Sequence, residues 1–235
     1  MYQQHFNTIG STQTYLKENW ETLRLKDHDI LISCSRQTEG VGRKGNTWET
    51  FPNGLALSFT LKPNPIPSLT PLEIGLMTIN FFRKKFKKDL VIKWPNDILD
   101  CEGNKCGGII CHYVDNSTVI AGLGINLGKF EMPSVLDFPC GLGCVDKNLE
   151  LNTQDQERIS REIYEEMLEH RILNTENFKN IFNRTCAHLN KKVSIYENGV
   201  DHVGIFKGIG GNGEALVEIN SSIETFISSS LTILD

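Results

Sequence analysis

The stretch EGVGRKGNTWETFPNGLALSFTL, residues 39–61, decides which folds the chain can have. Its residues 40–45 hold three glycines, an arginine and a lysine, and they half-match the dinucleotide pattern G-x-G-x-x-G and the P-loop pattern. Both patterns need a helix directly after the glycines, because its N-terminus binds the phosphates. Here Pro52, Asn53 and Gly54 predict a turn into a strand, and Asn46 stands where the P-loop has lysine. The sequence therefore excludes both nucleotide folds.

Composition and charge narrow the class of protein further. The chain has 235 residues and a net charge of −5, which gives no electrostatic footprint for nucleic acid. No apolar run approaches the roughly 18 residues of a membrane span, and the first residues lack a signal-peptide pattern. Seven cysteines without any C-x-x-C spacing suggest neither a disulfide framework nor a zinc site, but buried, reduced thiols. We expect a cytoplasmic protein that contacts neither nucleic acid nor a membrane.

Capping signals and apolar spacing predict the helices. Two capping boxes are expected, Thr70 with Glu73 and Thr153 with Gln156. A further helix is expected over 176–189, and Ser11 or Thr12 should cap a short one that runs to about Trp20. The basic cluster at 83–88 closes the first long helix; a solvated helix end explains it, and a docking surface for an acidic partner is the alternative.

Strand-like runs rich in β-branched residues separate these helices. They occupy residues 29–35, 54–61, 90–94, 107–114 and 118–127, with a hairpin turn at 114–117. Without regular βαβ alternation, an α/β (α+β) fold with a mixed or antiparallel sheet flanked by helices is favoured over a doubly wound parallel sheet. After about Lys191 only short strands follow, which indicates a small β-barrel. We expect two domains, 1–189 and 190–235.

The glycine loop alone does not decide between an anion-binding loop and a hairpin with incidental charges. Three further segments favour the anion site. VIKWPNDIL (91–99) places Lys93 at a strand end before a turn that displays Asn96 and Asp97. NKCGGIICH (104–112) pairs Lys105 with two glycines, and GLGINLG (122–128) carries Asn126 at a strand end.

Taken in order, SRQTEGVGRKGNTWETFPNGLALSFTL, IKWPNDIL, KCGGII and GLGINLG resemble the motif series of the biotin protein ligases, the biotin–[acetyl-CoA-carboxylase] ligases. The resemblance covers nearly the whole chain. It implies a catalytic domain like that of class II aminoacyl-tRNA synthetases, followed by an SH3-like barrel. Only about ten residues precede Ser11, so the monofunctional type without a DNA-binding domain is expected.

The resemblance also implies a reaction. Such ligases use ATP and Mg²⁺ to convert biotin to biotinyl-5′-AMP, and then transfer biotin to one lysine of a biotin carboxyl carrier protein domain. A carboxylate must approach an α-phosphate, so fixed cations have to separate two anions. By motif, Arg43 and Lys93 would be the catalytic pair, with Lys93 between carboxylate and phosphate and Arg43 closing the loop over the adenylate.

Further roles are carried over by motif. Trp48 is either a core or a pocket residue, and Lys105 either an active-site cation or a surface residue; Asp97 is a candidate metal ligand. Nucleotide contacts are expected from Arg43, Lys93, Asn96, Lys105 and Asn126. Biotin contacts are expected from Ser11, Thr12, Gln37, Gly40, Gly42, Arg43, Lys44, Trp48, Lys93, Gly107, Gly108 and Ile109.

Some positions depart from the family pattern. Gln13 follows the Ser-Thr pair where the family usually has asparagine, Val41 replaces a residue that is often basic, and residues 129–148, expected near the adenine, show no assignable motif. Three other functions were weighed: a lipoate ligase or octanoyltransferase of the same architecture, a biotin-sensing repressor, and an inactive biotin-binding module. Edge strands leave a homodimer open.

Overall fold

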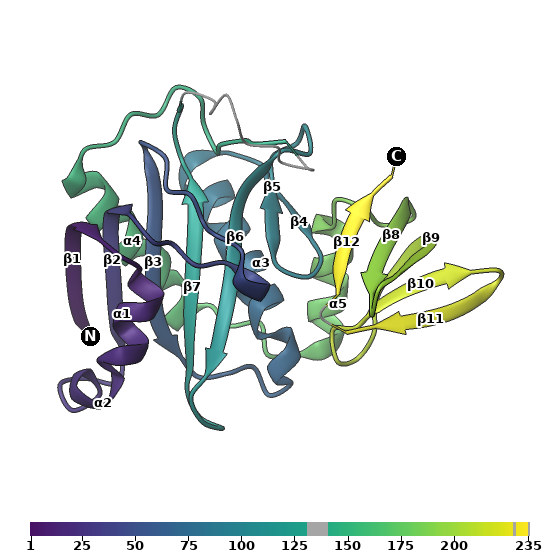
Figure 1. Ribbon diagram of the computed structural model, residues 1–235, viewed down its shortest axis with the longest axis horizontal. Coiled ribbons are helices and arrows are strands. Elements are labelled where there is room, and N and C mark those ends of the chain that lie inside the picture. Colours follow the sequence, from purple (N-terminus) through teal and green to yellow (C-terminus); the bar gives the residue numbers. More distant parts are fainter. Residues whose placement is uncertain (131–140, 228, 235) are drawn as a thin grey trace.

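Seven strands form the main sheet of the computed structural model, which describes residues 1–130, 141–227 and 229–234. The strand order is β1-β2-β3-β7-β6-β5-β4 (Figure 1). The first pair, β1 and β2, is parallel, and the remaining neighbours are antiparallel, so the expected mixed sheet is confirmed. The bounds are β1 (Tyr2–Ile9), β2 (Ile30–Gln37), β3 (Gly54–Leu61), β4 (Val91–Lys93), β5 (Asp97–Leu99), β6 (Lys105–Tyr113) and β7 (Val119–Asn126).

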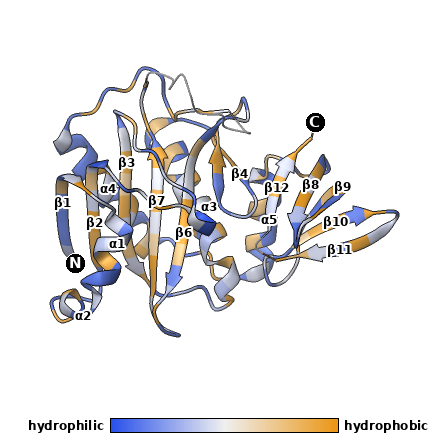
Figure 2. Ribbon diagram, viewed as in Figure 1, coloured by the Kyte–Doolittle hydropathy of each residue, from blue (hydrophilic) through white to orange (hydrophobic). Residues whose placement is uncertain are grey.

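Strand β3 lies in the interior of the sheet, next to the central strand β7, and all eight of its residues are buried. It pairs with β7 from Gly54 opposite Asn126 to Leu61 opposite Val119. A strand covered on both faces needs an apolar run rather than alternation, and Figure 2 shows β3 mostly in orange. The edge strand β1 (YQQHFNTI) is mostly polar, which is why the apolar patterns did not predict it.

Helices cover both faces of the sheet. On one face, α1 and α2 pack Leu16, Trp20 and Leu23 against Ile30, Ile32 and Ile120. On the other face, α3 and α4 contribute to the main core with Phe82, Ile163 and Tyr164. The bounds are α1 (Thr12–Glu18), α2 (Trp20–Leu23), α3 (Thr70–Phe86), α4 (Thr153–Glu169) and α5 (Thr175–Thr185). The part of the chain that the structure describes has no helix long and apolar enough to cross a membrane.

The predicted capping box at Thr70 is wrong. Leu69 is the N-cap of α3 and provides no side-chain hydrogen bond. The Thr70 hydroxyl instead accepts a hydrogen bond from the Asn64 backbone N–H at 3.0 Å. Glu73 is fully buried, and its Oε1 accepts a hydrogen bond from Arg171 Nε at 2.7 Å. A buried carboxylate requires such a paired cation. Both residues therefore tie neighbouring segments to α3 rather than cap it.

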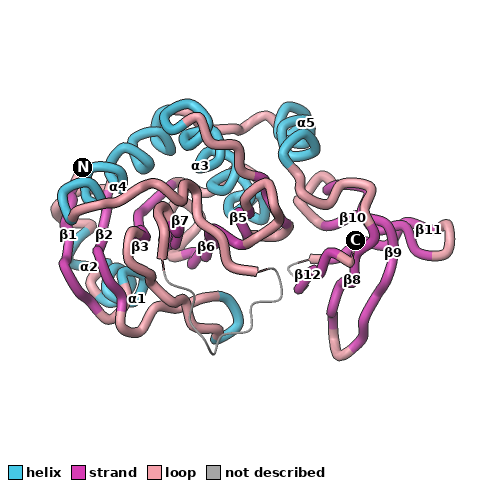
Figure 3. Tube along the Cα trace, turned by 90° about the horizontal axis from the view of Figure 1, so that it is seen from above, coloured by secondary structure: helices cyan, strands magenta, loops and turns pink. Residues whose placement is uncertain are grey.

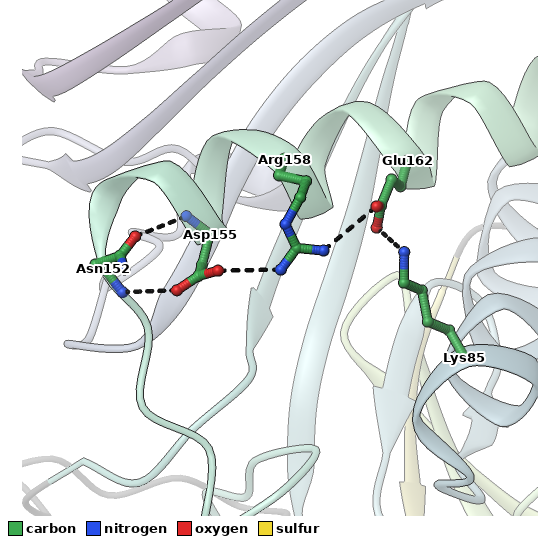
Figure 4. Close-up of polar contacts among 5 residues, drawn as sticks. All are labelled: Lys85, Asn152, Asp155, Arg158 and Glu162. Atoms are coloured by element: carbon green, nitrogen blue, oxygen red, sulfur yellow. Dashed lines mark hydrogen bonds and ion pairs between the residues drawn. The ribbon is translucent and has the colours of Figure 1, made fainter.

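The second capping box lies one residue earlier than predicted. Asn152 Oδ1 accepts from the Asp155 backbone N–H at 2.9 Å, and the Asp155 carboxylate accepts from the Asn152 N–H (Figure 4). Gln156, the predicted partner of Thr153, is buried and donates from Nε2 to the Gly54 carbonyl at 2.8 Å. Along the same helix, Glu162 accepts from Lys85 of α3, so the basic cluster at 83–88 is partly paired with α4. Ser11, in contrast, caps α1 as predicted.

A second, antiparallel sheet of five strands follows α5, in the order β11-β10-β9-β8-β12. It lies to one side of the main sheet (Figure 3) and is consistent with the expected SH3-like domain. Trp94 Nε1 donates to the Gly213 carbonyl at 2.9 Å and joins the two parts. The domain boundary at residue 189 stays a prediction. The bounds are β8 (Lys192–Glu197), β9 (Val200–Ile209), β10 (Ala215–Ile219), β11 (Ser222–Phe226) and β12 (Ser230–Ile233).

Candidate active site

The glycine loop after β2 closes on itself as a small hairpin. Val41 bridges Thr47, Gly42 N donates to Asn46 O at 2.7 Å, and Trp48 N donates to Gly40 O at 2.8 Å. Lys44 has φ 54° and adopts the left-handed conformation within the turn. The loop contains one 3₁₀ turn, Arg43–Gly45, and then leads into β3 without an α-helix, as the exclusion of both nucleotide patterns predicted.

Trp48 lies flat against glycines of the sheet beneath the loop. A Cβ built on Gly124 of β7 would lie 2.3 Å from Trp48 Cε2, and one on Gly108 of β6 would lie 3.5 Å from Trp48 Cζ3. Real Cβ contacts of the first kind do not occur, so position 124 has to be glycine for the indole to occupy this place. Of the two roles considered for Trp48, the structure therefore favours the wall of a pocket.

Three cationic side chains converge next to this loop. Lys105 Nζ lies 2.7 Å from Asp97 Oδ1, and Lys93 Nζ lies 3.4 Å from Asp97 Oδ2. Arg43 Nη1 donates to Asn96 Oδ1 at 2.7 Å. One carboxylate thus faces two ammonium groups with a guanidinium beside them, and this end of the site carries a net positive charge.

Burial affects these cations unequally. Lys93 is only 6% exposed, whereas the Lys105 side chain is more accessible. Burial lowers the pKa of Arg43 from its usual value, and the charge of Asp97 acts in the opposite direction. An arginine stays protonated at neutral pH despite such a shift. Lys105 shares Asp97 with Lys93 and lines the same cavity, which favours the active-site role over that of a surface lysine.

Asn96 fixes the turn that carries these groups. Its Nδ2 donates to the Ile109 carbonyl at 2.8 Å, and the Ile109 N–H donates back to the Asn96 carbonyl at 2.9 Å. The two bonds hold the turn after β4 against β6, so Asn96 Oδ1 meets Arg43 from a fixed position. Asn126 is similarly held, because its Nδ2 donates to the Gly143 carbonyl at 3.1 Å.

A cluster of uncharged polar groups lies away from the cations, around the start of α1. The Thr12 N–H and hydroxyl both donate to Gln37 Oε1, at 2.8 and 3.1 Å. The hydroxyls of Thr12 and Ser58 share a hydrogen bond of 2.9 Å. Ser11 Oγ accepts from Thr14 N at 3.3 Å as the helix cap. Buried, mutually bonded groups of this kind can orient a polar ring in an otherwise apolar pocket.

One cavity of about 620 Å³ joins the polar cluster and the cationic end. Ten of the twelve residues predicted to contact biotin line it, as do all five predicted nucleotide residues. Gly40 and Gly107 do not: a Cβ on Gly40 would lie 2.3 Å from Trp48 O, and one on Gly107 2.9 Å from Gly124 O. These two glycines serve close backbone packing behind the wall. The predicted residues in the lining are Ser11, Thr12, Gln37, Gly42, Arg43, Lys44, Trp48, Lys93, Asn96, Lys105, Gly108, Ile109 and Asn126.

Several lining residues were missed by sequence reasoning. Ser58 lies within the apolar run of β3, where a hydroxyl residue among apolar neighbours was the available signal. Residues 229–232 come from the C-terminal sheet, and no local pattern places them near residue 43. Gly141 and Leu142 line the cavity from the segment 129–148, whose residues 131–140 lie outside the described residues.

A protein-held metal site finds little support among the described residues. They contain no group of three histidine, cysteine, aspartate or glutamate side chains that could hold an ion. Both oxygens of Asp97 face lysine ammonium groups. Asp97 as a metal ligand stays a prediction that this arrangement does not favour.

A second cavity, of about 700 Å³, is also lined by residues of the glycine loop. It shares Gly42, Arg43 and Asn96 with the first cavity and extends to Pro71 of α3 and Gly213 of the C-terminal part. Residues of the loop therefore line both cavities.

Among proteins of known structure, the fold matches those of biotin protein ligases. One is the Aquifex aeolicus biotin protein ligase in complex with biotin and ATP, with a TM-score of 0.77, 23% identity and 99% of both chains covered. Another is the biotin acetyl coenzyme A carboxylase synthetase of Helicobacter pylori, with a TM-score of 0.68, 21% identity, and 96% of this chain and 99% of that chain covered. At these identities the likeness establishes the fold.

Sequence comparison assigns the family. Human biotin–protein ligase is 28% identical in an alignment 151 positions long, which covers 54% of this chain and 21% of that protein, so the chain spans about a fifth of this relative's length. The sequence model of the biotin/lipoate A/B protein ligase family matches residues 5–128, from β1 to the end of the GLGINLG segment. The chain therefore belongs to the biotin/lipoate A/B protein ligase family.

Proposed function

We propose that the protein uses ATP to activate biotin as biotinyl-5′-AMP and then transfers biotin to one lysine of a biotin carboxyl carrier protein domain. The observation that carries this proposal is the single cavity with Lys93, Lys105 and Arg43 at one end and a neutral hydrogen-bonding cluster at the other. The human relative and the Aquifex protein, whose structure contains biotin and ATP, support the choice of substrates.

The cationic end suits the first step. An oxygen of the biotin carboxylate attacks the α-phosphorus, the bond to the β-phosphate breaks, and pyrophosphate leaves. Two anions must come within bonding distance, and fixed positive groups compensate that repulsion without reorganising. Lys93 is buried and held by Asp97, so its ammonium group is preset for this place. We expect Lys93 to lie between carboxylate and phosphate.

Arg43 suits a different task in the same site. It belongs to the glycine loop and reaches Asn96 on the opposite wall, so it spans the mouth between loop and turn. A guanidinium there can bond the phosphate of the adenylate through its planar fork. Retaining the adenylate matters because water hydrolyses a mixed anhydride.

The second step needs a lysine amine to reach the acyl carbon, displacing AMP as the amine loses its proton. The second cavity shares Arg43 and Asn96 with the first, and we expect the acceptor chain to approach from that side. Mg²⁺ completes the proposed substrate set, arriving on the ATP phosphates as such ions usually do. A cytoplasmic location and a homodimer stay predictions.

The proposal is tested by incubating a candidate carrier domain with the protein, ATP, Mg²⁺ and biotin. Mass spectrometry should find one biotinyl group on one lysine. In parallel, ATP–pyrophosphate exchange is measured with biotin and with lipoate. Exchange that depends on lipoate and not on biotin would assign the chain to the other branch of its family, and no exchange with either would reject the adenylation step.

A further inference from the structure

Gln13 presents a buried hydrogen-bond acceptor that the protein itself does not use. The side chain is 5% exposed, and its Oε1 has no partner among the described residues. Its Nε2 donates to the Ile120 carbonyl at 3.0 Å. A carbonyl only accepts, so the amide nitrogen must face Ile120 and Oε1 must face away. Buried acceptors without partners are uncommon and call for an explanation.

The side chain that carries this oxygen lies at the wall of the substrate cavity. Gln13 lines both cavities and follows Thr12 in the first turn of α1. A Cβ on Gly122, which also lines the first cavity, would lie 2.8 Å from Gln13 Oε1. The absence of a side chain at position 122 therefore leaves space for this oxygen, and substitution there would displace it.

Acceptor positions in the neighbouring polar cluster are largely occupied. Gln37 Oε1 already receives two hydrogen bonds from Thr12, and Ser11 Oγ receives the Thr14 N–H. Gln37 Nε2 is a donor and suits a carbonyl oxygen of the substrate. The cyclic urea of biotin has one carbonyl oxygen but also two N–H donors, and each donor needs an acceptor once it is buried.

We propose that Gln13 Oε1 accepts a hydrogen bond from one urea N–H of the bound biotin and so contributes to substrate specificity. The inference rests on the proposed function and identifies a contact within that site. A carboxylic acid without an N–H, such as lipoate, would leave Oε1 buried and unpaired. Sites that hydrogen-bond a polar substrate group reject analogues that lack it.

The first test is the variant Gln13→Met, which keeps the length of the side chain and removes the acceptor. KM for biotin in pyrophosphate exchange should rise by about tenfold, whereas KM for ATP should not change. Biotin methylated on either urea nitrogen provides a second readout. At the nitrogen that faces residue 13, methylation should raise KM strongly in the parent protein and by less than about threefold in Gln13→Met.

Gln156→Met is the matched control. Gln156 is also 5% exposed and also donates from Nε2 to a strand carbonyl, that of Gly54, but it does not line either cavity. Its substitution should lower Tm and leave KM for biotin unchanged. If Gln13→Met does not fold, Gln13→Asn replaces it, since the shorter amide cannot both bond Ile120 and reach the cavity.

The outcomes separate the two proposals. An unchanged KM for biotin in a folded Gln13 variant, or an N-methyl penalty equal in variant and parent, overturns the role of Gln13 while biotin-dependent exchange still supports the proposed function. No biotin-dependent exchange in the parent protein overturns the proposed function, and this inference falls with it.

Discussion

Two loops of this chain carry the same G-x-G-x-x-G pattern, at 40–45 and at 208–213, and they do different things. The first forms a wall of the cavity and sends Arg43 to Asn96. The second is the turn between β9 and β10, and its Gly213 carbonyl accepts from Trp94 Nε1. Glycines determine which backbone shapes are accessible. The side chains around the loop determine whether that shape serves binding or packing.

The largest effect is expected at the cation opposite the first loop. Lys93→Met should slow biotin-dependent pyrophosphate exchange by about 10²–10³, because a preorganised charge at the reacting atoms is lost. Lys84→Met, on the exposed side of α3, is the control and should leave the exchange rate unchanged. Exchange within threefold of the parent rate would remove Lys93 from the proposed chemistry.

Arg43→Ala tests whether the first loop retains the intermediate. Adenylate should still form, since Lys93 and Lys105 remain, but it should dissociate early. The measurement is biotin found on an unrelated protein added to the reaction, which should rise by about tenfold over the parent enzyme, a shift of about 1.4 kcal/mol in retention. Tight retention by the variant contradicts a clamping role.

A pair of glycine substitutions separates the two loops directly. Gly45 and Gly213 have φ 80° and 79°, so alanine is strained at both positions. At 213 the new Cβ would also lie 2.8 Å from Leu69 Cδ2, whereas at 45 it meets open space. We expect Gly213→Ala to lower the free energy of unfolding by about 1–3 kcal/mol without changing KM for biotin or ATP.

Gly45→Ala should show the converse, a raised KM with a smaller loss of stability, measured by thermal unfolding and exchange kinetics on the same samples. Equal kinetic changes in both variants would show that the second loop also reaches the site.

The smallest effect is expected for the pH dependence of stability, through the buried His188. Burial, followed by the charges of Lys93 and Lys191, lowers the pKa of His188 to about 3. The ring packs on Phe206 of β9 at 4.2 Å between centroids. Folded His188 is therefore neutral, and the unfolded chain takes up the proton as pH falls below about 6.5. The free energy of unfolding therefore keeps its full value above about pH 6.5, and the part that depends on neutral His188 is lost progressively as the pH falls towards 3.

At pH 5.5 the buried neutral His188 lowers the free energy of unfolding by about 1.4 kcal/mol relative to its value at high pH. Unfolding by denaturant at pH 7.5 and 5.5 should show this loss in the parent protein and a smaller one in His188→Leu. A pH dependence that is identical in the two proteins would exclude His188 as its source.

Local patterns predicted much of this molecule, and tertiary contacts explain what they missed. β3 was predicted from Gly54 to Leu61, with the bounds that the structure has, because turn residues mark both ends of the apolar run. Thr70 and Glu73 matched a capping box, but the Asn64 backbone N–H bonds the Thr70 side chain and Arg171 bonds the buried Glu73. The local capping preference of a side chain is overridden when tertiary partners of this kind bind it.

The same limit applies to the candidate site. Arg43, Lys93 and Lys105 lie on segments with recognisable motifs, so the sequence predicted them, and the structure brings them to one cavity. The roles of individual side chains were harder to predict. Gln13 differs from the family pattern, and only the structure shows that its oxygen lies unpartnered beside Gly122 of β7. Residues 229–232 enter the lining from a different sheet, which no local spacing encodes.

The pairing of β3 with β7 has a consequence for synthesis on the ribosome. β2 and β3 are made early and can pair at once, but the other edge of β3 waits for residues 119–126. Until then a largely apolar strand presents open backbone groups, which is the kind of edge that promotes misassociation in nascent chains. Helix α3 is translated within this interval and covers one face of the sheet. The order of elements along the chain thus allows one face of β3 to be covered before its second edge is paired.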